Sequence, residues 1–140
     1  MELFLVSHVV SALFLCGLIW LIQLVHYPSF HYVEESKFVD FENFHTRRIS
    51  YLVVPSMLIE LGTGIWLCLQ FRDDWLWWLN LFSIIGIWLS TICFSIPCHK
   101  ILAKGKDSKV IRFLVISNWP RTCLWSFKIL ILGMALKELY

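Results

Sequence analysis

The sequence predicts an all-α integral membrane protein: a bundle of four transmembrane helices, with short interfacial helices on the cytoplasmic side. Of its 140 residues, 59% are hydrophobic and 16% are charged, and the mean hydropathy is +0.71. A soluble domain of this length leaves much of its surface in water and could not hide so much apolar area. The length allows one transmembrane domain, residues 1–140.

Three apolar runs are long enough to span a bilayer, which takes about 20 mostly apolar residues. They cover residues 3–25, 49–69 and 75–97. The first has no basic start and no small-residue cleavage site, so we expect a retained helix rather than a signal peptide. The connection FRDD at 71–74 is so short that the second and third spans must form a tight antiparallel hairpin.

The segment between the first two spans, residues 29–48, is polar but patterned. Phe38, Glu42, His45 and Arg48 recur at helical spacing. This pattern predicts an interfacial helix that leads into the second span.

The fourth span lies within residues 110–136, a stretch too long and too polar for one straight crossing. One interpretation is a single helix bent at Pro120. The other, which we favour, is a short interfacial helix followed by a new helix over 119–136, with Asn118 as its N-cap and Pro120 in its first turn.

The basic residues predict the orientation, because cytoplasmic loops carry an excess of Lys and Arg. Most of them lie in the loops after spans one and three: Lys37, Arg47, Arg48, Lys100, Lys104, Lys106, Lys109 and Arg112. The opposite side carries only Arg72 and Lys137. We therefore expect both termini to face outward (N-out/C-out), in what we expect to be a bacterial inner membrane.

Polar side chains gather on the predicted cytoplasmic side. His26 and Tyr27 end the first span, His45 leads into the second, and Asn118 and Arg121 open the fourth. An even scatter of polar residues would not produce this grouping. It predicts a polar pocket where the helix ends converge.

Two charges lie deeper in the predicted spans. Glu60 is 11 residues past Ile49, roughly 16 Å into the membrane, and Lys128 is nine residues past Trp119, roughly 13 Å in. A charge at such depth costs at least about 2.5 kcal/mol unless it is paired. The matched depths predict that Glu60 pairs with Lys128 or Arg121.

The histidines are candidate metal ligands, since imidazole is the commonest one in proteins. His26, His31, His45 and His99 would supply non-haem iron, copper or zinc, or two of them from facing helices would ligate haem. The sequence has no HExxH, and a di-iron carboxylate site needs two ExxH pairs where this chain has one. The cofactor is therefore left open.

The same region offers groups that would bind an amphiphilic molecule. Arg48 and Arg121 carry forked donors suited to carboxylate or phosphate, with Tyr27, Asn118 and Trp119 as further substrate contacts. In an enzyme, three histidines and one buried acid would act as ligands or as general acids and bases: His26, His45, His99 and Glu60.

Five motifs in order resemble a family of small bacterial four-helix membrane proteins of unassigned activity: QLVHYPSF, FENFHTRR, the acid Glu60, PCHKILAKG and NWPRTCLW. The chain has a more distant likeness to anthrone oxygenase-like membrane proteins, which have an asparagine and an arginine near the start of the last helix, as Asn118 and Arg121 are here. The second resemblance implies an oxygenase of polycyclic aromatics.

Three hypotheses of function follow. The first is a metal- or haem-dependent oxidoreductase acting on a lipophilic substrate. The second is a binder or transporter of a small anion or lipid, which would need a homo-oligomer to form a pore. The third is a structural or assembly subunit of a membrane complex. The net charge of +2 and the absence of a basic tail exclude nucleic acid as a partner.

Overall fold

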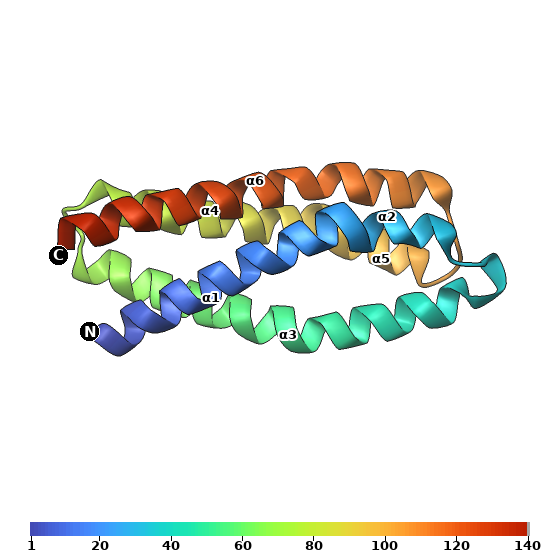
Figure 1. Ribbon diagram of the computed structural model, residues 1–140, viewed down its shortest axis with the longest axis horizontal. Coiled ribbons are helices and arrows are strands. Elements are labelled where there is room, and N and C mark those ends of the chain that lie inside the picture. Colours follow the sequence, from blue (N-terminus) through green and yellow to red (C-terminus); the bar gives the residue numbers. More distant parts are fainter. Residues whose placement is uncertain (140) are drawn as a thin grey trace.

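The computed structural model describes residues 1–139, and within that range the chain is all-helical, with no strand. Four long helical rods lie lengthwise beside one another (Figure 1). The first rod is built from α1 (Glu2–Leu21), the π-helical segment η1 (Ile22–His26), α2 (Tyr27–Ser29) and the 3₁₀ turn η2 (Phe30–Tyr32). The others are α3 (Glu35–Gln70); α4 (Trp75–Ser90) with the π-helical segment η3 (Thr91–Ser95) and α5 (Ile96–Leu102); and α6 (Ser108–Leu139).

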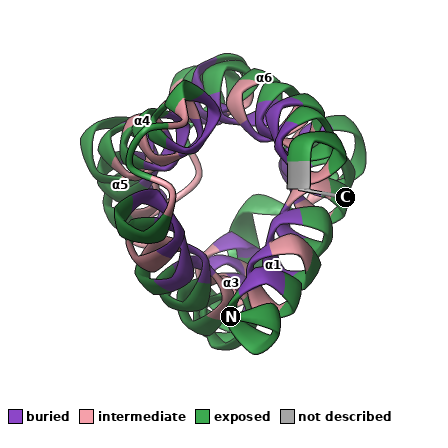
Figure 2. Ribbon diagram, turned by 90° about the vertical axis from the view of Figure 1, so that its left-hand side faces the viewer, coloured by how far each residue is buried: buried purple, intermediate pink, exposed green. Residues whose placement is uncertain are grey.

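Three of the rods are long and apolar enough to cross a membrane: Glu2–Tyr32, Glu35–Gln70 and Trp75–Leu102. They contain the three predicted spans. Large apolar side chains such as Leu3, Val10, Leu58, Phe82 and Leu130 remain exposed on the outside of the rods. Figure 2 shows exposed residues facing outward on every rod and buried ones facing inward, as expected for helices whose surroundings are apolar.

The rods form a closed ring, because α4 packs on α6, α6 on α1, α1 on α3 and α3 on α4. Both termini and the turn 71–74 lie at one end of the molecule, and the connections 33–34 and 103–107 lie at the other (Figure 1). We call the second end the loop end. The two basic loops of the sequence therefore meet at the loop end, opposite the termini.

The expected interfacial helix before the second span is not a separate element. Residues 35–48 are helical, but they continue without a break into α3, which has 36 residues and a length of about 54 Å. Phe38 and Glu42 are fully buried in this extension, so tertiary packing holds it as part of the bundle.

The favoured interpretation of the fourth segment is wrong. A single helix, α6, runs through Pro120, and its N-terminus is capped by Asp107, whose Oδ1 accepts from the backbone N–H groups of Lys109 (2.8 Å) and Val110 (3.2 Å). Asn118 caps nothing, because its amide is buried and donates to Gln23 in the first rod instead.

The first and third rods run past their predicted ends at 25 and 97, and each contains a π-helical segment just before a proline. Pro28 and Pro97 have no N–H for the carbonyl four residues earlier. A local change to π geometry is one way in which a helix in lipid tolerates this loss. Such segments are also frequent at functional sites.

Candidate functional site

The interior contains a cavity of about 460 Å³ in the half of the bundle nearer the loop end. One wall is α3, from His45 to Met57, and the other runs from Trp88 to Ala103 across α4, η3 and α5. Residues of α1 and α6 line the remaining side. Exposed side chains stand on both walls, Val54 on one and Ile92 on the other, so the cavity opens sideways between these rods.

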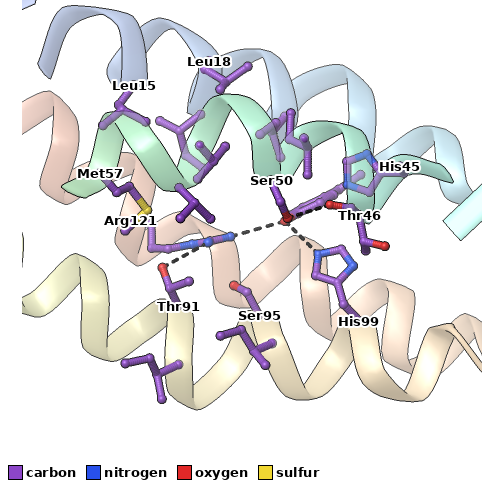
Figure 3. A pocket seen from close by; sticks show the side chains of 18 of the residues that line it. Leu15, Leu18, His45, Thr46, Ser50, Met57, Thr91, Ser95, His99 and Arg121 are labelled. Atoms are coloured by element: carbon purple, nitrogen blue, oxygen red, sulfur yellow. Dashed lines mark hydrogen bonds between the residues drawn. The ribbon is translucent and has the colours of Figure 1, made fainter. Parts of the chain in front are cut away.

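Most of the lining is apolar, and Arg121 is the one arginine in it. Its side chain is only 6% exposed. Figure 3 shows the guanidinium extended into the pocket beside Thr91, whose Oγ1 accepts from Nη1 at 3.3 Å. The Nε–H has no hydrogen-bond partner, and no carboxylate among residues 1–139 lies within ion-pair distance of this guanidinium.

Asn118 and Gln23 hold Arg121 in place from behind. The Asn118 Oδ1 accepts from Nη2 of Arg121, and the Asn118 amide donates to Oε1 of Gln23 at 2.7 Å. The Gln23 amide in turn donates to the backbone carbonyl of Val115 at 3.1 Å. Asn118 was expected to touch substrate; it is a positioning residue, outside the cavity lining.

A hydrogen-bonded chain leads from Arg121 toward the loop end. Nη2 of Arg121 lies 3.5 Å from the Tyr27 hydroxyl, which lies 3.2 Å from Nε2 of His99. Nδ1 of His99 is 2.6 Å from Oε1 of Glu42, a fully buried carboxylate. Tyr27, His99 and Arg121 line the cavity, whereas Glu42 stands behind His99.

His26 and His45 form a second pair at the same end. Nε2 of His26 and Nδ1 of His45 are 2.7 Å apart, so one ring donates an N–H to the unprotonated nitrogen of the other. His45 lines the cavity and its ring lies 5.7 Å from that of His99, centroid to centroid. His26 supports His45 from outside the lining.

Three predicted site residues lie elsewhere. His31 is exposed in η2, and Arg48 is exposed with its guanidinium 5.4 Å from the centre of the Phe44 ring. Trp119 is 42% exposed and packs edge-on against Trp20. The helical phase of each residue turns it away from the cavity.

The convergence of histidines does not amount to a ready-made metal centre. Among residues 1–139, no group of three or more His, Cys, Asp or Glu side chains is arranged to hold a metal ion. His26 and His45 use the facing nitrogens on each other, His99 uses its Nδ1 on Glu42, and His31 is remote.

The buried charges of the sequence meet deeper in the bundle. Nζ of Lys128 bonds Oε1 of Glu60, and both residues are fully buried. The indole N–H of Trp125, which also lines the cavity, lies 3.3 Å from both oxygens of Glu60. Of the two basic residues considered for Glu60, Lys128 is the partner and Arg121 is not.

Several members of the site are residues that sequence reasoning did not select. Glu42 was noted only as part of the helical pattern of residues 29–48, and Thr91 was not singled out. A further polar group, in which His8 bonds Thr63 and Asn80, lies toward the terminal end and was missed as a cluster. Thr91 could have been found from the sequence, because polar residues recur every four positions at 91, 95 and 99 in an otherwise apolar run.

Comparisons of the chain with protein-family models, with curated proteins and with solved structures gave no match.

Proposed function

We propose that the chain is an integral membrane four-helix bundle with both termini outside and the loop end in the cytoplasm, and that its cavity binds a lipophilic molecule with an anionic head group. Three rods of spanning length and an apolar exterior support the membrane setting. The basic loops at the loop end support the orientation by the positive-inside rule. The rod α6 completes the bundle and keeps its charges Arg121 and Lys128 inside it.

The observation that carries the binding proposal is the state of Arg121. A guanidinium that is always charged is buried beside an apolar cavity without an acid to neutralise it. Burying an unpaired charge is costly in protein and in lipid. A bound carboxylate, or a similar oxygen anion, would neutralise it and accept from the free Nε–H.

The shape of the cavity fits the rest of such a ligand. About 460 Å³ is within the range of pockets that hold drug-sized molecules. Apolar side chains such as Leu15, Ile49 and Val53 would contact the tail. The sideways opening between α3 and η3 would let the ligand enter from the bilayer without crossing water.

Binding of cis-parinaric acid, a fluorescent fatty acid, tests the proposal on the purified protein in detergent. We expect saturable binding of the acid, and weaker binding of its methyl ester, which has no charge. Arg121→Gln should weaken binding of the acid about 30-fold, the equivalent of a charge-assisted hydrogen bond of about 2 kcal/mol. Arg112→Gln is the matched control, since Arg112 is an exposed arginine of the same helix. Equal affinity of wild type and Arg121→Gln, or of acid and ester, would refute the proposal.

A second candidate is a metal- or haem-dependent oxidoreductase acting on a lipophilic substrate. The observation in its favour is that His26, His45 and His99 lie together at the polar end of a cavity suited to such a substrate. Rotation of the paired rings would free their nitrogens for a metal. The test is stoichiometric iron, copper, zinc and haem analysis of the wild type and of His45→Ala, with His31→Ala as an exposed control. A wild type free of metal and haem, after expression with both supplied, would exclude this candidate.

A further inference from the structure

Tyr27 occupies the junction between the cavity and the chain of polar residues behind it. Its side chain is 4% exposed and lines the cavity. The hydroxyl lies between Nη2 of Arg121, which donates to it at 3.5 Å, and Nε2 of His99 at 3.2 Å. The phenol therefore has a cation on one side and an imidazole within proton-transfer distance on the other.

The order of groups is that of a catalytic triad in which a phenol replaces the serine. Glu42 fixes His99 by accepting from Nδ1–H, which leaves Nε2 free to take a proton from the Tyr27 hydroxyl. The buried carboxylate then stabilises the imidazolium that forms.

We propose that this site catalyses proton transfer, with Tyr27 as the general base, and that its substrate is a lipophilic carbonyl compound with a C–H group next to the carbonyl. This inference rests on the proposed function, because it places the head group of the bound molecule at Arg121. The carboxylate of the binding experiment then stands in for the enolate that forms during the reaction.

The protons and electrons of the step balance without an oxidant or a metal. The C–H bond breaks and its proton goes to the Tyr27 oxygen, while the original Tyr27 proton goes to Nε2 of His99. The electron pair of the broken bond moves to the carbonyl oxygen, which becomes an enolate. In the reverse steps a proton returns to the carbon, which restores the ketone, or goes to the enolate oxygen, which gives the enol.

Arg121 would stabilise the enolate. Its Nε–H is buried, faces no acceptor and stands on the same guanidinium that contacts Tyr27. Ser95, which also lines the cavity, has a buried hydroxyl without a partner. Electrostatic catalysis usually relies on preorganised hydrogen-bond donors of this kind, which stabilise a charge that develops only during the reaction.

The relay also connects the reacting carbon with water. The side chain of His99 is 18% exposed, in contrast with that of Glu42, which is fully buried. A proton passed to His99 can therefore exchange with solvent before it returns. The predicted signature is exchange of the carbon-bound hydrogens of the substrate with deuterium from the solvent.

Hydrogen–deuterium exchange into octanophenone, an aryl ketone on an apolar chain, tests the inference in detergent micelles made with D₂O. Mass spectrometry should show faster exchange than in protein-free micelles. Tyr27→Phe and His99→Gln should lower the protein-dependent rate about 100-fold, as expected for loss of a general base. Tyr32→Phe, an exposed tyrosine of the same rod, should leave it unchanged.

Glu42→Gln separates a role in the relay from a role in folding. It should slow exchange while leaving the affinity for cis-parinaric acid unchanged, because a neutral amide stabilises the imidazolium of His99 less than the carboxylate does. This variant decides the matter if Tyr27→Phe fails to fold by circular dichroism. A wild type that binds cis-parinaric acid but does not speed exchange, or a Glu42→Gln variant that exchanges as fast as wild type, would overturn the inference and leave the binding proposal standing. Failure of Arg121-dependent binding would overturn the binding proposal itself.

Discussion

Replacing Lys128 by methionine should destabilise the bundle far more than removing both members of its ion pair. The Lys128 and Glu60 side chains are 0% and 1% exposed, respectively. Lys128→Met keeps the length of the side chain but leaves Glu60 with only the Trp125 indole N–H, at 3.3 Å from each oxygen. Breaking a buried pair from one side costs about 3–5 kcal/mol, because the remaining charge has no partner.

The double variant Glu60→Leu/Lys128→Met removes both charges and should unfold within about 1 kcal/mol of the wild type, since apolar replacement of a buried pair is often neutral or stabilising. The measurement is unfolding in mixed micelles of rising SDS content, followed by tryptophan fluorescence. Lys137→Met, at an exposed lysine of the same helix, should change stability by less than about 0.5 kcal/mol.

Two results would refute this reasoning. If Lys128→Met costs less than about 1 kcal/mol, the amine is not holding a buried carboxylate in the folded bundle. If the double variant costs the sum of Lys128→Met and the single variant Glu60→Leu, measured in the same assay, the charges are independent and the contact does not stabilise the fold.

Three further predictions follow from the same structure. A reporter fused after Tyr140 should be active only outside the cytoplasm, because the basic loops lie at the end opposite the C-terminus (Figure 1); a C-terminal fluorescent protein that folds normally in the cytoplasm would contradict this orientation. Asn118→Ala should weaken cis-parinaric acid binding about tenfold by releasing Arg121, whereas Asn43→Ala, at an exposed asparagine of α3, should have no effect in the same titration. Gly64→Ala should lower stability by about 1 kcal/mol in the SDS assay, since the new Cβ would lie 2.7 Å from Cδ1 of Ile84 and 3.2 Å from Cε1 of His8. Gly17→Ala is the control and should be neutral or stabilising, because its new Cβ would have no atom within 4 Å.

The three spanning rods were predictable because their signal is local. Each is an apolar run of the length a bilayer demands, and helix is the form in which such a run satisfies its own backbone. The short turn at 71–74 and the grouping of basic residues at one end were predictable for the same reason.

The fourth rod was not predictable because Asn118 and Pro120 suit two local structures. Asparagine before proline is a good helix start, and proline within a helix is tolerated where neighbours compensate. The choice is made by Gln23, 95 residues away, which accepts from the buried Asn118 amide. No local pattern contains that partner.

Residue type alone also failed to separate Arg121 from Arg48. Both are forked donors near the same end of the bundle, but one is 6% exposed and the other stands outside on Phe44. The difference is the helical phase relative to neighbours whose register becomes known only from the packing. Trp119 was predicted to contact substrate because it lies between Asn118 and Arg121 in the sequence. Its helical phase instead leaves it 42% exposed, outside the cavity.

The two π-helical segments account for how the polar residues reach one cavity. In a regular α-helix, positions four apart advance roughly 40° beyond a full turn, so Thr91 and His99 would diverge by roughly 80°. The wider π turn over Thr91–Ser95 takes more residues per turn and offsets part of this drift, and Thr91, Ser95 and His99 all line the cavity. The matching segment Ile22–His26 precedes Tyr27 on the facing rod. Pro28 and Pro97 therefore contribute to the site indirectly: the π-helical segments before them help Tyr27 and His99 to reach the same cavity.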